Sequence, residues 1–571
     1  IGTSRGIGIG HVLIVYNASA VVNRGTHYNA EEEKKRFFEA RKTFIEQTEE
    51  LLSELEKKLG EFDKDALVLK NQIYLARDIT TENEVVAAID NSHICAEAAF
   101  DDVCNKLIQL FSSMDNPDMQ QRVTDIQDMR ERMIQILQGT KAFDLTNLPD
   151  NTVIVADEIK PSMTASMDIA HVAGIVAEKG GDTAHASILA RALEIPAVLS
   201  VKGILQKVKN GDSIIIDGAY GEVFINPTQR TFSIYEKKKK KYEEHIEELK
   251  TFINKSTETA DGKKVMLAAN IGGADEAAKA VKAGAEGVGL FRTEFLFLNK
   301  NALPTEEEQF EEYKKAAVLT KGMPLTIRTL DIGGDKDIPY MGLTKETNPF
   351  LGYRAIRFCL DRVDIFTTQL RAILRASAYG SIRIMITMIT SVNEVRQVKD
   401  MIKKICSDLD HNGISYDKNI QTGVMIETPA AAIMADSIAQ EVDFFSIGTN
   451  DLTQYTIAVD RCNENVAYLY SAFNPAVLRL IRRIIECAHN AGIEAGMCGE
   501  AAANALMAPI LLSFGLDEFS VSTGKVLETR KTIADWTLKE AGLVTDKVMS
   551  MATEKEVTDY LSDYISERNK K

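Results

Sequence analysis

The second half of the chain contains eight short apolar runs that alternate with longer helical patterns. Short apolar runs bounded by turn residues are typical of buried strands, and their alternation with helices predicts a parallel sheet. Eight repeats within about 310 residues match a (β/α)8 TIM barrel, which usually takes ~250 residues. The sequence therefore predicts a C-terminal barrel with strands at residues 265–270, 287–291, 325–329, 382–388, 423–426, 444–447, 493–497 and 518–521.

Polar residues follow several of these runs, at the points where the strands should end. In a TIM barrel the carboxyl ends of all the strands meet at one rim, where active sites are built. Polar groups after five different strands are difficult to explain by packing alone. The alternative for each charged residue is a structural ion pair. The candidate site residues are Arg292, Arg328, Glu427, Asn450, Asp451 and Cys498, with Arg461 a short distance further along the chain.

Three arginines at one rim suit a small substrate that carries two anionic groups. The guanidinium groups of Arg292, Arg328 and Arg461 can each bind phosphate or carboxylate oxygens through paired hydrogen bonds, and Asn450 adds a neutral donor. The sequence contains no GxxxxGK[ST] loop, so a nucleotide is not indicated as the source of phosphate.

Glu427 and Asp451 are the expected magnesium ligands. Mg²⁺ prefers hard oxygen ligands and usually takes only one or two protein carboxylates, with water and substrate supplying the rest. Structural carboxylates are the alternative. Cys498 could be a small buried hydrophobic residue, but at a barrel rim we assign it the role of proton donor.

Residues 180–191, GGDTAHASILAR, place a histidine where a tight turn should become a helix. Two glycines permit the turn, Asp182 or Thr183 can cap the helix, and the alanines that follow favour it. Backbone amides and the dipole at a helix N-terminus favour phosphate, so His185 is a candidate for phosphorylation. An ordinary surface histidine is the alternative.

A helical block is predicted between residues 30 and 139, because apolar residues recur there at helix spacing. Turn residues at Gly60, 80–83 and 116–117 divide it into about four helices, enough for two helical hairpins. Its apolar stripes are expected to be packing surfaces.

Short strand patterns on both sides of this block indicate a small α/β domain that the block interrupts. They lie at residues 11–16, 152–156, 174–177, 197–200 and 213–217, and the glycines before the first run are expected to shape the entry to an edge strand. A nearly all-polar helical pattern at 236–255 indicates a connector. We therefore predict a multidomain α/β protein with a phosphohistidine α/β domain in residues 1–23 and 141–226, an inserted all-helical subdomain in 24–140, a helical linker in 227–258 and the barrel in 259–571.

The composition of the chain argues against several classes of binding partner. A net charge of −16 disfavours general binding to nucleic acid or membrane surfaces. The seven cysteines form no CxxC pair, and no apolar run reaches the ~20 residues of a membrane span. We expect a cytoplasmic protein that binds no nucleic acid and has no membrane span.

Seven stretches, in this order, resemble enzyme I of the bacterial phosphoenolpyruvate:sugar phosphotransferase system: GGDTAHASILAR, GAEGVGLFRTEFLF, RTLDIGGDK, NPFLGYRAIR, GVMIETP, DFFSIGTNDLTQYTIAVDR and GMCGE. The resemblance extends over nearly the whole chain. It implies that His185 carries the phosphoryl group with Thr164 as its hydrogen-bond partner, that Arg292, Arg328, Asn450 and Arg461 hold phosphoenolpyruvate, that Glu427 and Asp451 bind Mg²⁺, and that Cys498 protonates the enolate to give pyruvate. It also implies that the helical subdomain docks the histidine-containing phosphocarrier protein and that the barrel forms a homodimer.

The chain departs from the usual pattern of that family at Asp182, at Lys160, at residues 501–504 and at residues 520–530. Two other functions are open. A pyruvate phosphate dikinase or phosphoenolpyruvate synthase would need a large ATP-binding domain as well, and a regulatory paralogue would bind the carrier without catalysis. The retained arginines, carboxylates, His185 and Cys498 favour the phosphotransferase.

Overall fold

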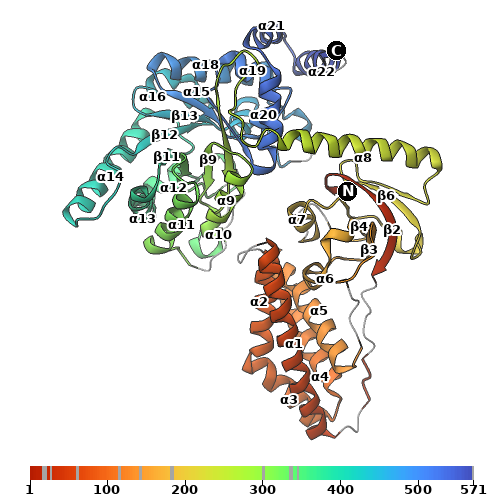
Figure 1. Ribbon diagram of the computed structural model, residues 1–571. Helices are drawn as coiled ribbons and strands as arrows, with labels where there is room; N and C mark the ends of the chain where they lie inside the picture. Colours follow the sequence, from red (N-terminus) through yellow and green to blue (C-terminus); the bar gives the residue numbers. More distant parts are fainter. Residues whose placement is uncertain are drawn as a thin grey trace. The chain divides into compact units, whose positions relative to one another are not determined.

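The computed structural model describes residues 1–15, 22–25, 29–59, 64–113, 117–140, 145–180, 185–298, 302–333, 338–343, 346–463 and 465–568. The chain forms two compact units, residues 1–246 and residues 247–571, and each is described by itself (Figure 1). Among the described residues, no helix is both long and apolar enough to span a membrane.

The first unit contains a seven-stranded mixed sheet. Its apolar runs pack on both faces, with Ile154 and Ile175 on one and Val153 and Val176 on the other. In spatial order the strands are β1 (Gly2–Ser4), β5 (Ala197–Val198), β4 (Val172–Ala177), β3 (Thr152–Ala156), β2 (Ile7–Val15), β6 (Ser213–Asp217) and β7 (Glu222–Ile225). The pairs from β5 to β2 are parallel, and the outer pairs are antiparallel.

The expectation that the first run forms an edge strand is wrong, because β2 pairs with β3 on one side and with β6 on the other. Glycines are needed here because neighbouring backbone comes close. A Cβ at Gly10 would lie 1.9 Å from the Asn151 carbonyl oxygen, and one at Gly8 would lie 2.4 Å from the Ala173 carbonyl oxygen.

In its described residues the helical block contains five helices and not about four. They are α1 (Ala30–Leu59), α2 (Lys64–Arg77), α3 (Ile79–Ser92), α4 (Ala96–Ser112) and α5 (Pro117–Leu137). The break expected at 80–83 lies instead at Asp78, whose side chain accepts a hydrogen bond from the Thr81 amide at 2.8 Å and caps α3. A further break follows at His93, which ends α3 in the left-handed conformation with φ of 50°.

Two short helices stand beside the sheet, α6 (Pro161–Ser166) and α7 (His185–Ala192). Helix α7 buries Ala186 and Ala190 against one face of the sheet and begins at His185, as the sequence predicts. A long connector helix, α8 (Gln229–Lys250), continues into the second unit.

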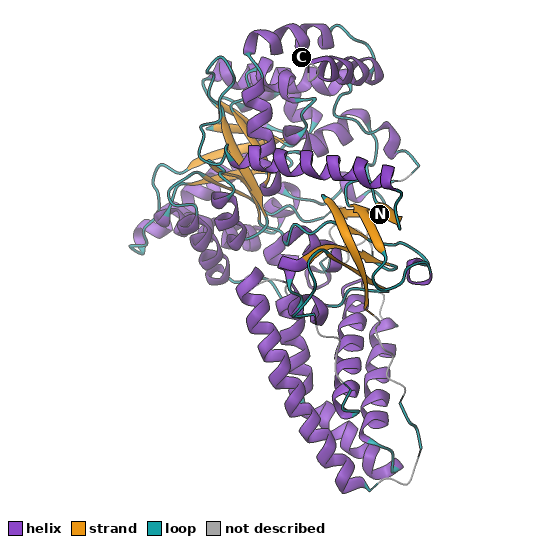
Figure 2. Ribbon diagram, turned by 45° about the vertical axis from the view of Figure 1, so that its right-hand side comes forward, coloured by secondary structure: helices purple, strands orange, loops and turns teal. Residues whose placement is uncertain are grey.

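The second unit is a closed barrel of eight parallel strands surrounded by helices, so the predicted fold class is confirmed (Figure 2). The strands are β8 (Met266–Ile271), β9 (Gly287–Arg292), β10 (Leu325–Arg328), β11 (Ile382–Ile386), β12 (Gln421–Ile426), β13 (Phe444–Ile447), β14 (Glu494–Met497) and β15 (Glu518–Ser522). The helices are α9 (Ala274–Lys282), α10 (Phe295–Leu298), α11 (Glu306–Leu319), α12 (Ile356–Asp361), α13 (Val363–Ala376), α14 (Val392–His411), α15 (Pro429–Ile433), α16 (Ala435–Ile438), α17 (Thr449–Ile457), α18 (Pro475–Ala491), α19 (Ala508–Phe514), α20 (Val526–Asp535), α21 (Leu538–Met549) and α22 (Glu554–Arg568).

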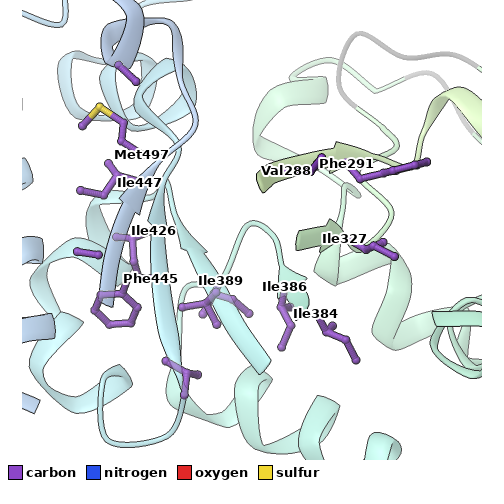
Figure 3. Close-up of a cluster of buried hydrophobic side chains, with 14 of the residues drawn as sticks. Val288, Phe291, Ile327, Ile384, Ile386, Ile389, Ile426, Phe445, Ile447 and Met497 are labelled. Carbon is purple, nitrogen blue, oxygen red and sulfur yellow. The ribbon is translucent and has the colours of Figure 1, made fainter. Parts of the chain in front are cut away.

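Side chains alternate between the two sides of the barrel wall. A small cluster of Leu290, Met385, Met425, Phe444 and Cys498 packs inside the barrel, apart from the main core. The main core contains residues next to them along the chain, among them Phe291, Ile384, Ile386, Ile426, Phe445 and Met497. Figure 3 labels these together with Val288, Ile327, Ile389 and Ile447 of the same core. This alternation turns every second residue at the strand ends toward the barrel axis.

The amino-terminal end of the barrel is closed by a structural ion pair. Arg383 donates to the Glu518 carboxylate at 2.6 Å and to the Thr326 hydroxyl at 3.0 Å, with its guanidinium carbon 4.7 Å from the centre of the Phe444 ring. Each guanidinium nitrogen of this arginine has a protein partner. We therefore assign Arg383 a structural role, in contrast with the arginines at the opposite rim.

Two further contacts hold the ends of the second unit to the barrel. Arg530, 1% exposed, donates to the Phe252 and Ile253 carbonyl oxygens at 2.9 and 3.2 Å and to the Thr257 hydroxyl at 2.9 Å. Trp536, at the end of α20, stacks on Tyr564 of α22 with ring centres 6.1 Å apart. The segment after α8 and the C-terminal helix are therefore parts of the barrel unit.

Candidate active site

Within the described part of the barrel unit, six buried charged side chains gather at the carboxyl ends of the strands. We call Glu294, Arg328, Asp331, Arg354, Glu427 and Asp451 the rim cluster, and none of them is more than 7% exposed. They come from strand ends and from the loops that follow, so segments far apart in sequence meet at one rim, as the fold predicts.

Arg354 connects the cluster. Its guanidinium binds both oxygens of Asp331, at 3.0 and 3.2 Å, and also donates to an Asp451 oxygen at 3.0 Å and to the Tyr455 hydroxyl at 3.2 Å. Arg328 pairs with Glu294, and its Nη1 lies 3.5 Å from Asp331. Charge-assisted bonds of this kind fix side chains in position when both partners are buried.

The cluster holds more negative than positive charge. It contains four carboxyl groups and two guanidinium groups. Burial lowers the pKa of Arg354, but Asp331 and Asp451 outweigh it, so the net shift is upward. Burial, followed by the charges of Asp451 and Asp331, raises the pKa of Glu427 well above its usual range. A buried excess of carboxylates is the arrangement that a divalent cation would neutralise.

Buried polar atoms without a partner mark the space for a ligand. Among the described residues these include Arg328 Nε, Arg461 Nη1 and Asp451 Oδ1, together with the Thr387 hydroxyl. Unpaired buried groups are costly, so protein sites retain them where a ligand or water completes the bonding. Two guanidinium donors and one carboxylate acceptor are therefore available to bind an anion together with a cation.

The remaining anion-binding candidates lie around the cluster. Arg292 ends β9 and is exposed, and Asn450 is in the first turn of α17, where its side-chain oxygen accepts from the Glu500 amide at 3.4 Å. Arg461 follows α17. Burial lowers the pKa of Arg461, but nearby negative charge, that of Asp451 above all, outweighs it, so the net shift is upward.

The Cys498 backbone is held by strands on both sides. Its amide donates to the Ile447 carbonyl oxygen at 3.2 Å, and its own carbonyl oxygen accepts from the Asn270 side chain at 3.0 Å. Burial raises the pKa of the Cys498 thiol to about 11, although the Ser446 hydroxyl, Arg328 and Arg292 act in the opposite direction. The thiol is therefore protonated at neutral pH, and the nearby arginines can stabilise the thiolate left after a proton is donated.

We expect iodoacetamide to modify Cys498 ~100-fold more slowly than a thiol of ordinary pKa near neutral pH. Only the thiolate reacts, and raising the pKa of the thiol from 9.0 to about 11 removes ~99% of the thiolate. Burial will slow the reaction further. Cys462 is exposed and supplies an internal control in the same chain. Peptide mapping by mass spectrometry would measure both rates, which should converge in urea. Equal rates in the native protein would contradict the environment described for Cys498.

Met388 and Ala355, two residues near the rim, have positive φ angles. Met388, with φ of 57°, donates its amide to a Glu427 oxygen at 2.7 Å, and Ala355, with φ of 51°, follows Arg354 directly. Such conformations are unfavourable for residues with a Cβ and persist where the surroundings impose them. Both therefore mark places where backbone geometry serves the rim cluster.

His185 and Thr164 belong to the first unit and not to the barrel. His185 is the first residue of α7, Thr164 lies on α6, and these two helices contact each other. Gly180 has φ of 102°, which glycine adopts without strain, and the tight turn expected after it lies outside the described residues. Asp182 and Thr183, and the side chains of His185 and Thr164, lie outside the described residues.

Lys160, one of the departures from the family pattern, is 7% exposed and pairs with Glu131 of α5. In the same short segment, the Ser162 hydroxyl donates to Asp128 of α5 at 2.7 Å. These contacts attach α6 to the helical block. The departure thus has a structural partner within the first unit.

Sequence reasoning missed three members of the rim cluster: Glu294, Asp331 and Arg354. All three lie in loops after strands, where hydrophobic periodicity gives no signal. They do occur inside the stretches FRTEFLF, RTLDIGGDK and NPFLGYRAIR, so the motifs contained the information although no role was assigned to these residues.

Three families match successive parts of the chain. The N-terminal domain of the phosphoenolpyruvate (PEP)-utilising enzymes matches residues 1–122, the mobile domain of these enzymes matches 148–221, and their PEP-binding domain matches 246–538. The last match includes all six members of the rim cluster.

Curated relatives match over most of the chain. A phosphoenolpyruvate-protein phosphotransferase of Bacillus sp. (strain S) is 46% identical over 84% of this chain and 83% of its own length. The protein of the same name from Priestia megaterium is 43% identical over 87% of both chains. That of Bacillus subtilis is 41% identical over 99% of this chain and 98% of its own. The chain therefore belongs to the phosphoenolpyruvate-protein phosphotransferase family.

Proposed function

We propose that this chain takes the phosphoryl group of phosphoenolpyruvate onto His185, releases pyruvate and passes the group to the histidine-containing phosphocarrier protein, the first step of sugar uptake by the phosphotransferase system. The observation that carries this proposal is the set of unpartnered buried atoms at the rim, Arg328 Nε, Arg461 Nη1 and Asp451 Oδ1. A phosphorylated carboxylic acid bound together with a cation would satisfy all three.

Arg292, Arg328 and Arg461 hold the phosphate and carboxylate oxygens of phosphoenolpyruvate in this proposal, and Asn450 donates a further hydrogen bond. Arg328 is held from the opposite side by Glu294 and Asp331. Positioned guanidinium groups lower the barrier because they need no reorganisation as charge shifts from the phosphoryl group to the enolate oxygen.

Glu427 and Asp451 fit a magnesium ion. Their oxygens are hard donors, one Asp451 oxygen has no protein partner among the described residues, and the cluster carries an excess of negative charge. When bound, Mg²⁺ neutralises charge on the phosphate oxygens during transfer. Arg354 keeps Asp451 in position for this role through its 3.0 Å hydrogen bond.

The chain's own residues supply the nucleophile and the proton. A ring nitrogen of His185 attacks phosphorus while the bond from phosphorus to the enolate oxygen breaks. The Cys498 thiol then donates its proton to the methylene carbon of the enolate, which gives pyruvate, and the thiolate recovers a proton from solvent. Thr164 supports the His185 ring by a hydrogen bond.

The helical subdomain is proposed to dock the phosphocarrier protein, and the barrel to form a homodimer. The proposal of a homodimer is supported by exposed apolar side chains on two short 3-10 helices of the barrel unit, Leu351 at 66%, Tyr468 at 78% and Leu469 at 49%. Because His185 and the rim belong to different units, residues 227–258 are proposed to act as a swivel that lets His185 serve both sites.

Incubation with radiolabelled phosphoenolpyruvate and Mg²⁺ tests the proposal. We expect the chain to acquire a label that is labile in acid and stable in base, as for a phosphorylated histidine, and chelation of the metal should prevent labelling. A regulatory paralogue without catalysis would stay unlabelled. No label, or a label with the opposite stability, would reject the proposed reaction.

A further inference from the structure

A glutamine in the helical layer makes hydrogen bonds to two segments of the rim. Gln369, in the middle of α13, is fully buried. Its side-chain oxygen accepts from the Leu330 amide at 2.9 Å. Its side-chain nitrogen donates to the Thr293 hydroxyl at 3.2 Å and to the Tyr313 hydroxyl at 3.3 Å. Both N–H groups of the amide therefore have an acceptor.

Both rim segments carry an arginine assigned to phosphoenolpyruvate. Thr293 directly follows Arg292, and Leu330 lies two residues after Arg328. The Thr293 hydroxyl in turn donates to the carbonyl oxygen of Arg328 at 2.8 Å, and the two arginines are paired across β9 and β10. One side chain thus fixes, directly or through one hydroxyl, the backbone next to both arginines.

We propose that Gln369 is a positioning residue for the proposed reaction: it sets the spacing of Arg292 and Arg328 and thereby the affinity for the phosphate of phosphoenolpyruvate. This inference rests on the proposed function. Nothing in the sequence distinguishes Gln369, since it lies inside a helix and outside the barrel wall.

The network also has an outer branch that supplies a control. The Tyr313 hydroxyl donates to the Gln309 side-chain oxygen at 3.2 Å, and the Gln309 nitrogen donates to the Pro304 carbonyl oxygen at 3.1 Å. Gln309 is 1% exposed, so it matches Gln369 in residue type and burial, but its bonds reach a loop and not the rim. If the loss of a buried hydrogen bond were itself the cause of an effect, substitution of either glutamine should have the same effect.

The test replaces each glutamine with methionine, which is similar in length and has no hydrogen-bonding amide. We expect Gln369→Met to raise KM for phosphoenolpyruvate about 10-fold or more and to lower kcat/KM about 10- to 100-fold, since small displacements of binding groups have effects of that size. Gln309→Met should leave KM within about twofold of wild type. Exchange of phosphate between phosphorylated carrier protein and His185 needs no rim and should be unchanged in both variants.

The readouts separate positioning from stability. A purely structural role would reduce the fraction of active protein, which lowers kcat and leaves KM unchanged. Gln369→Glu keeps the acceptor for Leu330 and, because burial favours the protonated acid, also one donor, so it should recover part of the lost affinity. If Gln369→Met fails to fold, Thr293→Val breaks the same connection with little change of shape and should also raise KM.

An unchanged KM in folded Gln369→Met, or an equal rise in Gln309→Met, would overturn the inference. Direct binding of phosphoenolpyruvate to the unaltered chain with Mg²⁺, measured by calorimetry, keeps this failure distinct from failure of the proposed function. Absence of such binding would reject the proposed function itself. Tight binding by wild type and by Gln369→Met alike would reject only the role of Gln369.

Discussion

Replacing His185 with alanine is expected to abolish phosphorylation of the chain by phosphoenolpyruvate. A phosphoryl acceptor has no substitute within the site, so labelling should fall at least ~10³-fold, to the background set by other nucleophiles. The fold should persist, because His185 is the first residue of α7 and the buried side chains described for that helix include Ala186, Ser187 and Ala190. Labelling with radioactive phosphoenolpyruvate would measure the effect.

His171→Ala is the matched control. His171 is a partly exposed histidine of the same unit, and its ring nitrogen lies 2.8 Å from an Asp168 oxygen. Its removal should leave labelling at the wild-type level. Wild-type labelling of His185→Ala would mean that another residue accepts the phosphoryl group, and loss of labelling in both variants would point to a general disturbance of the first unit.

Dividing the chain after Lys250 is expected to separate the two halves of the reaction completely. The fragment of residues 1–250 should exchange phosphate with phosphorylated carrier protein but take none from phosphoenolpyruvate. The fragment of residues 251–571 should bind phosphoenolpyruvate with Mg²⁺ but acquire no label. Both should fold, since the clusters of buried apolar residues lie wholly within one unit or the other.

The position of the division follows from Arg530, which binds carbonyl oxygens of Phe252 and Ile253 and the Thr257 hydroxyl. A division after residue 258 would remove these partners from the barrel. Labelling of the first fragment by phosphoenolpyruvate alone would mean that the rim is not the substrate site. Mixing the fragments tests in addition whether the covalent connection is needed for transfer.

Most of the barrel could be predicted from the sequence because each of its repeats is local. All eight strands lie within a few residues of the apolar runs that predict them, since a buried parallel strand is apolar along its whole length. Strand order inside the first unit could not be obtained in this way. The hydrophobic pattern of β2 indicates which of its side chains are buried but not which strands lie beside it. An interior strand was therefore expected at the edge of the sheet.

The position of a candidate site residue was predictable where that residue lies at a strand end. Arg328, Glu427 and Cys498 follow directly from that rule, and motif resemblance supplied their roles. Arg354 and Asp331 could not be predicted in this way, because they lie in loops and the contacts they make join segments that are distant in the sequence. The left-handed conformation of Met388 had no sequence signal either, since no glycine or asparagine marks that turn.

Trp536 gives the protein an unusual optical property. It is the single tryptophan among 571 residues, is 2% exposed, and is packed between the Tyr564 ring and the Arg568 guanidinium, which lies 4.3 Å from its ring centre. Its carbonyl oxygen accepts from the Ala260 amide at 2.8 Å, ahead of the first barrel strand, so it stands at the end opposite the rim. Indole fluorescence therefore reports the melting of the barrel alone, whereas the helical signal in circular dichroism sums both units, and a difference between the two curves measures how independently the units unfold.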